Sequence, residues 1–159
     1  MRFAILIFFL LISPSMMAAK PVFENDYMRE YVMQGNFADT REALELAITG
    51  KGLVINNISH IGNMLQRTGK DIGANKNIYQ KAEAMEFCSA NLSRKMMEAD
   101  PRNIVFCPFI ITIYTLAGED NKVHIAYRKP LIVGSKASRK SLMAVNKLID
   151  DIVQATLEW

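Results

Sequence analysis

The feature that most constrains the fold is a long strand-forming run in the second half of the chain. Residues 104–115 (IVFCPFIITIYT) are mostly β-branched or aromatic, which is typical of a strand buried on both faces. Pro108 lacks the backbone N–H that a sheet needs, so it indicates an edge position, a bulge, or a strand that starts after it. A turn at 117–121 then leads to 122–128 (KVHIAYR), where apolar and polar side chains alternate. Together the two segments predict a β-hairpin.

Shorter helix and strand patterns surround this hairpin, with Asp39, Ser89 and Ser138 as predicted helix N-caps. The order of the predicted elements is β-α-β-(α)-β-α-β-β-α, in which helices and strands do not alternate strictly. That order predicts an α+β fold with two layers: a curved, mainly antiparallel sheet of about five strands, and helices packed on one face. The expected strands are 27–33, 53–58, 81–88, 104–115 and 122–128, and the expected helices are 39–50, 59–73, 89–99 and 138–156.

The N-terminus has the order of a secretory signal. Arg2 precedes an apolar stretch at 3–12 (FAILIFFLLI), a Ser-Pro-Ser break follows, and the small residues Ala18 and Ala19 come next. The stretch is shorter than the roughly 20 residues that cross a membrane; an uncleaved anchor or a buried helix is the alternative. We predict a signal peptide at 1–19, cleaved after Ala18 or Ala19, and a single domain at 20–159. The expected location is the periplasm, where the domain would be soluble and without membrane contact.

Composition narrows the function classes. Half of the residues are hydrophobic, 22% are charged, and the formal net charge is +3. Those values exclude a disordered chain and a polycation of the kind that coats nucleic acid, so we expect no nucleic-acid partner. Phosphate-loop, dinucleotide-binding and nucleophile-elbow motifs are absent from the sequence. We therefore predict no catalytic residue, no metal site and no cofactor.

Three short motifs carry a resemblance to a known family. They are 87–90 (FCSA), 107–109 (CPF) and 127–130 (YRKP), within a region that reaches from about 27 to 130. In these motifs the chain resembles the exported proteobacterial branch of the domain-of-unknown-function-302 family. The resemblance implies a two-layer α+β fold like half of the TATA-box-binding protein, with no established activity and no catalytic residue. It also implies that the fold requires neither Cys88 nor Cys107, because the more widespread branch lacks both thiols.

The two cysteines become informative once export is predicted, because an oxidising compartment favours disulfides. Cys88 lies at a predicted strand-to-helix junction, and Cys107 lies near the start of the long strand. Three interpretations stay open: a structural disulfide, which would stabilise the domain by about 3 kcal/mol in the chain-entropy model; two buried thiols; or a redox-active or metal-binding pair. The sequence has no C-x-x-C motif that would support redox chemistry. His60 and His124 form no metal-ligand spacing with the two cysteines.

The end of the predicted hairpin holds the polar residues best placed to meet a ligand. Arg128, beside Tyr127, can clamp an anion; the alternative is a strand-end arginine paired with a surface carboxylate. The sequence thus predicts a non-enzymatic binding, interaction or accessory protein. We expect it to act as a homo-oligomer such as a dimer, or with an envelope partner or a small ligand. A redox-active or metal-binding protein that uses Cys88 and Cys107 is the alternative function.

Overall fold

The chain forms helices and strands in the predicted order, with one short strand added at the start. The computed structural model describes residues 18–74 and 76–159. The strands are β1 (Phe23–Glu24), β2 (Met28–Gln34), β3 (Val54–Ser59), β4 (Tyr79–Cys88), β5 (Phe109–Leu116) and β6 (Lys122–Arg128). The helices are α1 (Phe37–Gly50), α2 (Ile61–Gly69), α3 (Ala90–Ala99) and α4 (Lys136–Leu157), with short 3-10 helices η1 (Lys70–Ile72) and η2 (Pro101–Phe106).

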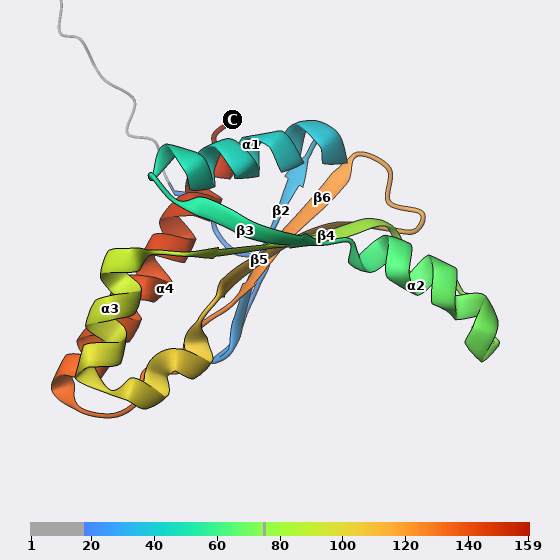
Figure 1. Ribbon diagram of the computed structural model, residues 1–159. Coiled ribbons are helices and arrows are strands. Elements are labelled where there is room, and N and C mark those ends of the chain that lie inside the picture. Colours follow the sequence, from blue (N-terminus) through green and yellow to red (C-terminus); the bar gives the residue numbers. More distant parts are fainter. Residues whose placement is uncertain (1–17, 75) are drawn as a thin grey trace, which may run out of the picture.

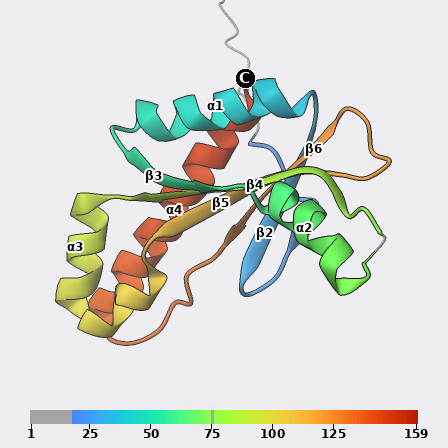
Figure 2. The same cartoon turned by 45° about the vertical axis from the view of Figure 1, so that its right-hand side comes forward.

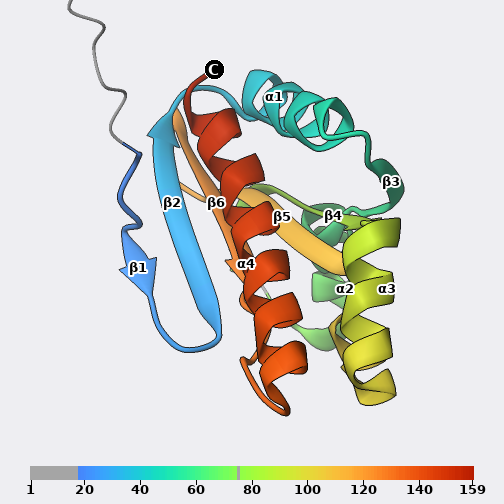
Figure 3. The same cartoon turned by 90° about the vertical axis from the view of Figure 1, so that its left-hand side faces the viewer.

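All six strands belong to one antiparallel sheet, in the order β1-β2-β6-β5-β4-β3. Figure 3 shows α4 lying along the sheet, with α1 and α3 beside it on the same face. The short helix α2 stands apart from these three and contacts β4 (Figures 1 and 2). The predicted α+β class is therefore confirmed, with six strands where about five were expected.

The hairpin of β5 and β6 lies near the middle of the sheet, where Ile111 pairs with Tyr127 and Ile113 pairs with Ile125. Along β5, buried and half-buried side chains alternate strictly. The prediction that this run is buried on both faces is wrong for the strand, because α1, α3 and α4 all cover the same side. The side chains of β5 on the opposite face are half-buried and mostly apolar.

The first part of the predicted long strand is a helical turn. Residues 104–106 belong to η2, and the strand begins at Phe109, after Pro108. The side chain of Asp100 caps η2 by accepting a backbone N–H, and a proline at the first position favours the turn. Of the alternatives for Pro108, the structure therefore has a strand that starts after it, preceded by a cis peptide bond from Cys107.

Two N-caps lie one turn before the predicted residues. Asn36, rather than Asp39, caps α1 by accepting the backbone N–H of Asp39 at 2.9 Å. Ser135, rather than Ser138, caps α4, and Ser138 is buried in the first turn of that helix. In both cases the cap accepts the backbone N–H of the residue three positions further on, which is the residue predicted as the cap. Both helices therefore begin one turn earlier than predicted. Ser89 caps α3 as predicted.

The hydrophobic core fills the space between α4 and the sheet. Both layers contribute residues with almost no exposed surface, because the sheet presents one apolar face and α4 presents one apolar stripe. The largest of these include Leu142, Ile149 and Ile152 from α4, and Tyr31, Met85, Phe87, Ile111, Ile113 and Ile125 from the strands.

A glycine allows α2 to approach β4. A Cβ atom built on Gly62 would lie 2.8 Å from the backbone nitrogen of Ala82, closer than real Cβ contacts. Glycine is unfavourable inside a helix, but at this position the missing side chain is what permits the packing. The helix predicted over 59–73 is divided into α2 and η1, and it ends where Gly73 takes a left-handed conformation, with φ at 71°.

We expect Gly62→Ala to lower the free energy of unfolding by about 1–3 kcal/mol, because backbone on β4 must move to make room. The matched control is Gly50→Ala at the end of α1, where an added Cβ meets no atom within 4 Å. That change should be neutral or stabilise by up to about 1 kcal/mol through helix propensity. Urea unfolding measures both variants, and a neutral Gly62→Ala would contradict the close approach.

Candidate functional site

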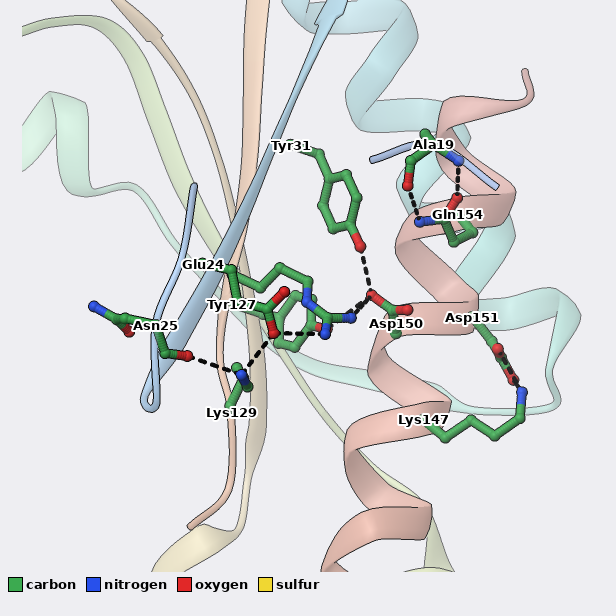
Figure 4. Close-up of polar contacts among 11 residues, drawn as sticks. Ala19, Glu24, Asn25, Tyr31, Tyr127, Lys129, Lys147, Asp150, Asp151 and Gln154 are labelled. Carbon is green, nitrogen blue, oxygen red and sulfur yellow. Dashed lines mark hydrogen bonds and ion pairs between the residues drawn. The ribbon is translucent and has the colours of Figure 1, made fainter. Parts of the chain in front are cut away.

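A single carboxylate joins α4 to the sheet (Figure 4). The Oδ1 atom of Asp150 accepts hydrogen bonds from the hydroxyls of Tyr31 and Tyr127, each at 2.8 Å. The guanidinium of Arg29 forms an ion pair with the same oxygen at 2.8 Å. Tyr31 and Arg29 lie on β2 and Tyr127 lies on β6, so this cluster fixes two neighbouring strands to the helix.

Burial and charge together hold this cluster in one protonation state. Burial of Asp150 would raise the pKa of its carboxyl, but the hydrogen bonds from Arg29, Tyr31 and Tyr127 outweigh it and lower the pKa below 3.8. Burial, and then the hydrogen bond to Asp150, raises the pKa of Tyr127, and the same two causes raise the pKa of Tyr31. At neutral pH the carboxylate is charged and both phenols keep their protons, which suits a structural role.

The cluster continues outward to the edge strand β1. Arg29 also contacts Glu24 at 2.7 Å, and the ammonium of Lys129 donates to Glu24 at 2.7 Å and to the carbonyl of Asn25 at 2.8 Å. These hydrogen bonds from Arg29 and Lys129 lower the pKa of Glu24 to about 2. The charge of Lys129 is thus matched by a carboxylate within the protein.

A cavity of about 240 Å³ opens beside this cluster. It lies where η2 joins β5, where β6 ends, and where α4 passes over them. Two basic residues, Arg128 and Lys129, lie in its lining, together with the exposed residue Tyr27. The remaining wall is mostly apolar and includes Phe106, Pro108, Phe109, Ile110, Val145 and Ile149.

Arg128 differs from its neighbours in having no protein counter-charge. Its side chain is exposed, and the ion pairs found within residues 18–74 and 76–159 do not include it. In the described part of the chain it is therefore not the arginine paired with a surface carboxylate that the sequence left as an alternative. The structure places Tyr127, the other predicted ligand contact, in the buried cluster with 2% of its surface exposed, outside the cavity lining.

The two cysteines lie together at the same end of the sheet. Cys88 ends β4 and Cys107 follows η2, and their Sγ atoms are 3.6 Å apart. That separation is a contact between two thiols, since a disulfide bond is about 2.05 Å long. Burial, and then the neighbouring Cys107, raises the pKa of the Cys88 thiol to about 11. Both side chains are half-buried. The two thiols are in contact but not bonded, and a disulfide between them stays a prediction.

The histidines lie elsewhere. His60 contacts Glu83 at 2.9 Å beside α2. His124, on the face of the sheet opposite α4, lies between Glu30 at 2.8 Å and Glu119 at 3.0 Å. Within residues 18–74 and 76–159, no three His, Cys, Asp or Glu side chains gather as a metal-ion site would require. In the same residues, no helix combines the length and the apolar character that crossing a membrane demands.

Comparison with known proteins decides the family. The family described as "Domain of unknown function DUF302" matches residues 29–157. The chain belongs to the DUF302 family. A solved structure, an uncharacterized conserved protein DUF302 from Bacillus stearothermophilus, is similar in fold, with a TM-score of 0.62 and 17% sequence identity over 79% of this chain and 97% of that one. No curated protein matches the chain.

Sequence patterns of the DUF302 chain identify Arg128 but miss the residues around it. Asp150 and Arg29 meet across 121 positions of the chain, and no local motif predicts such a contact. One signal was available: Asp150 interrupts the apolar stripe of α4, between the buried residues Ile149 and Ile152. An acid in that position needs a partner, because an unpaired buried charge is costly.

We expect Asp150→Asn to lower the free energy of unfolding at pH 7 by about 2–3 kcal/mol, because Arg29 would keep its charge next to a neutral amide. The matched control is Asp151→Asn. Asp151 is more exposed, and its one ion pair within the described residues is with Lys147 in the preceding turn, so its loss should cost about 0.5 kcal/mol or less. Urea unfolding gives both values, and equal effects would contradict the role of the cluster.

The same variant tests the pH dependence. Because folding lowers the pKa of Asp150, its carboxylate stabilises the folded state above the unfolded value of 3.8 and loses that effect as the pH falls through the folded pKa. Asp150→Asn should therefore lose less stability than the wild type when the pH is lowered below 3.8.

Proposed function

We propose that this DUF302 protein is a non-enzymatic binding domain that takes a small anion with an apolar body into the cavity beside Arg128. The observation that carries the proposal is the position of Arg128: this exposed arginine lies in the lining of a mostly apolar cavity and forms no ion pair within the described residues. A guanidinium binds carboxylate or phosphate oxygens through paired N–H donors. The apolar wall then takes the rest of the ligand.

The contrast between the two basic residues supports this assignment. Lys129 already donates to Glu24 and to a backbone carbonyl, so its charge is used within the protein. Arg128 supplies the net positive charge of the site. A cavity of about 240 Å³ is below the roughly 300–1,000 Å³ of sites for drug-sized molecules, which favours a ligand the size of a short fatty acid.

The chemistry of the surrounding groups supports binding rather than catalysis. The acid and the two phenols of the neighbouring cluster, Asp150, Tyr31 and Tyr127, satisfy one another, and their pKa values are shifted away from neutral pH. A general acid or base works best when its pKa is close to the working pH. These groups therefore suit a fixed wall behind the cavity.

Octanoate, compared with its neutral analogue octanol, tests the proposal by calorimetric titration. We expect octanoate to bind and Arg128→Gln to weaken it by about 10-fold or more, the loss of one charge-assisted contact, while any octanol binding is unchanged. Arg139→Gln is the matched control, because Arg139 is also exposed but lies on α4 outside the cavity lining. Equal effects of the two variants would contradict an anion site at Arg128.

Export to the periplasm is part of the same proposal. Residues 1–17 lie outside the described residues, so the support comes from the segment that follows. Ala19 donates its backbone N–H to the side chain of Gln154 at 2.8 Å and accepts from it at 3.0 Å (Figure 4). The chain is thus attached to α4 from the first residue that would remain after cleavage behind Ala18.

We expect the protein recovered from the periplasm of an expressing Gram-negative cell to begin at Ala19 or Lys20, as measured by intact mass and N-terminal sequencing. A Gln154→Ala variant keeps the signal and should show the same N-terminus. Recovery of the protein only in the cytoplasm with Met1 retained would contradict export.

Two further partners stay predictions: a second copy of this chain and an envelope protein. The redox alternative gains one specific observation, the contact of the two thiols at 3.6 Å.

A further inference from the structure

The two thiols are held by different kinds of backbone. Cys88 is the last residue of β4 and is paired with Val54 on β3 within the sheet. Cys107 lies between η2 and β5, outside the strand pairs. One sulfur is therefore fixed by the sheet, while the other lies on a connecting segment.

We propose that Cys88 and Cys107 form a reversible redox site, oxidised to a disulfide by exchange with an external low-molecular-weight or protein disulfide, and that closing the bond moves one wall of the cavity. The contact of the two Sγ atoms and their half-buried position carry the first part. The second part follows from the chain around Cys107. The redox chemistry stands by itself, whereas its effect on ligand binding rests on the proposed function.

The environment of each sulfur assigns the order of the steps. The hydroxyl of Ser93 lies 3.2 Å from the Sγ atom of Cys107, where it can donate a hydrogen bond to a thiolate. No such hydroxyl contacts Cys88 within the described residues. A hydrogen bond from the backbone of Phe109 favours the Cys88 thiolate, but burial and the neighbouring Cys107 outweigh it and raise the pKa of that thiol. Cys107 is therefore the sulfur that attacks first, and Cys88 is the one that resolves the intermediate.

The exchange then has two balanced steps. The Cys107 thiolate attacks one sulfur of the external disulfide, a mixed disulfide forms, and the displaced thiolate takes up the proton that Cys107 released. Cys88 then loses its proton and attacks the Cys107 sulfur, which forms the internal bond and releases the second external thiol. Two electrons pass from the cysteine pair to the external disulfide, which leaves as two thiols.

Closing the bond requires the two Sγ atoms to approach from 3.6 Å to about 2.05 Å. Because β4 holds Cys88 in the sheet, most of that movement falls to Cys107. Its neighbours in the chain, Phe106 and Pro108, both line the cavity. Oxidation therefore moves the wall that faces the ligand, although neither sulfur lines the cavity.

The first experiment uses the wild-type protein, reduced with dithiothreitol and then incubated with oxidised glutathione. We expect the intact mass to fall by two hydrogen atoms, both thiols to disappear in a thiol titration, and both to return when dithiothreitol is added. Thiols that stay reduced, or a product that carries only glutathione adducts, would overturn the redox site. These measurements need no ligand.

Single variants test the order of the steps. Cys88→Ser should accumulate a glutathione adduct at Cys107, because the resolving thiol is missing. Cys107→Ser should form its adduct at Cys88 about 10-fold more slowly at pH 7 than Cys88→Ser forms its adduct at Cys107. Cys88 lacks the hydroxyl contact of Cys107, and burial, the first cause of its raised pKa, remains in the variant. A faster reaction at Cys88 would reverse the assignment, and the circular dichroism spectrum of each variant checks that it is folded.

The effect on the cavity is measured with octanoate, whose dissociation constant is compared between the oxidised and reduced protein. We expect at least a 3-fold difference that disappears in the double variant Cys88→Ser, Cys107→Ser. Equal affinities in the two forms would overturn the movement of the wall. Failure of octanoate to bind either form would count against the proposed function and would leave the redox site to be judged by mass and thiol titration.

Discussion

The burial of one face of α4 against the sheet is the interaction on which the rest of the structure depends. The sheet has an apolar face along β2, β6 and β5 that must be covered, and side chains such as Leu142, Ile149 and Ile152 cover it completely. Each buried side chain of this kind contributes roughly 1.5–3 kcal/mol. Hydrophobic burial has little directional preference, so a second interaction must decide how the helix lies. Asp150 supplies it, because its carboxylate joins residues on two different strands.

The position of α4 also creates the cavity. Val145 and Ile149 on the helix approach the start of β5 and the end of β6, and the remaining space is left between side chains of all three elements. The polar cluster around Asp150 borders this space and neutralises most of the charge near it. Within the described residues Arg128 stays outside that network, so the unpaired charge of the site comes from one side chain that forms no ion pair there.

Local sequence patterns predicted most elements and part of the site. The alternation in 122–128, the cap at Ser89 and the order of elements all depend on neighbours in the chain, and the structure confirms them. The error at 104–106 has a definite cause: β-branched composition favours a strand, but the capping side chain of Asp100 and the proline after it impose a helical turn.

Contacts between distant parts of the chain set the limit of that reasoning. The short motif at the end of β6 predicts Arg128 as a ligand contact, and the structure places this residue in the cavity lining. Tyr127 was assigned to the same site, yet its hydroxyl bonds to Asp150 on a helix that the motif does not include. Strand alternation places consecutive residues on opposite faces, so the two neighbours meet different surroundings. Only the packing of α4 shows which of them meets the cavity.

The compartment decides which redox form of the cysteine pair would meet a ligand. In the cytosol, reducing agents keep cysteines in the thiol form, so the two Sγ atoms at 3.6 Å would stay in contact without a bond. In the periplasm, thiol oxidation is favoured, so the oxidised form would be the resting state and reduction the signal. The direction of any control over the cavity therefore follows from the location of the protein. The segment that joins η2 to β5 is suited to transmit such a change, because it lies outside the strand pairs and connects directly to Phe109, which pairs with Phe87.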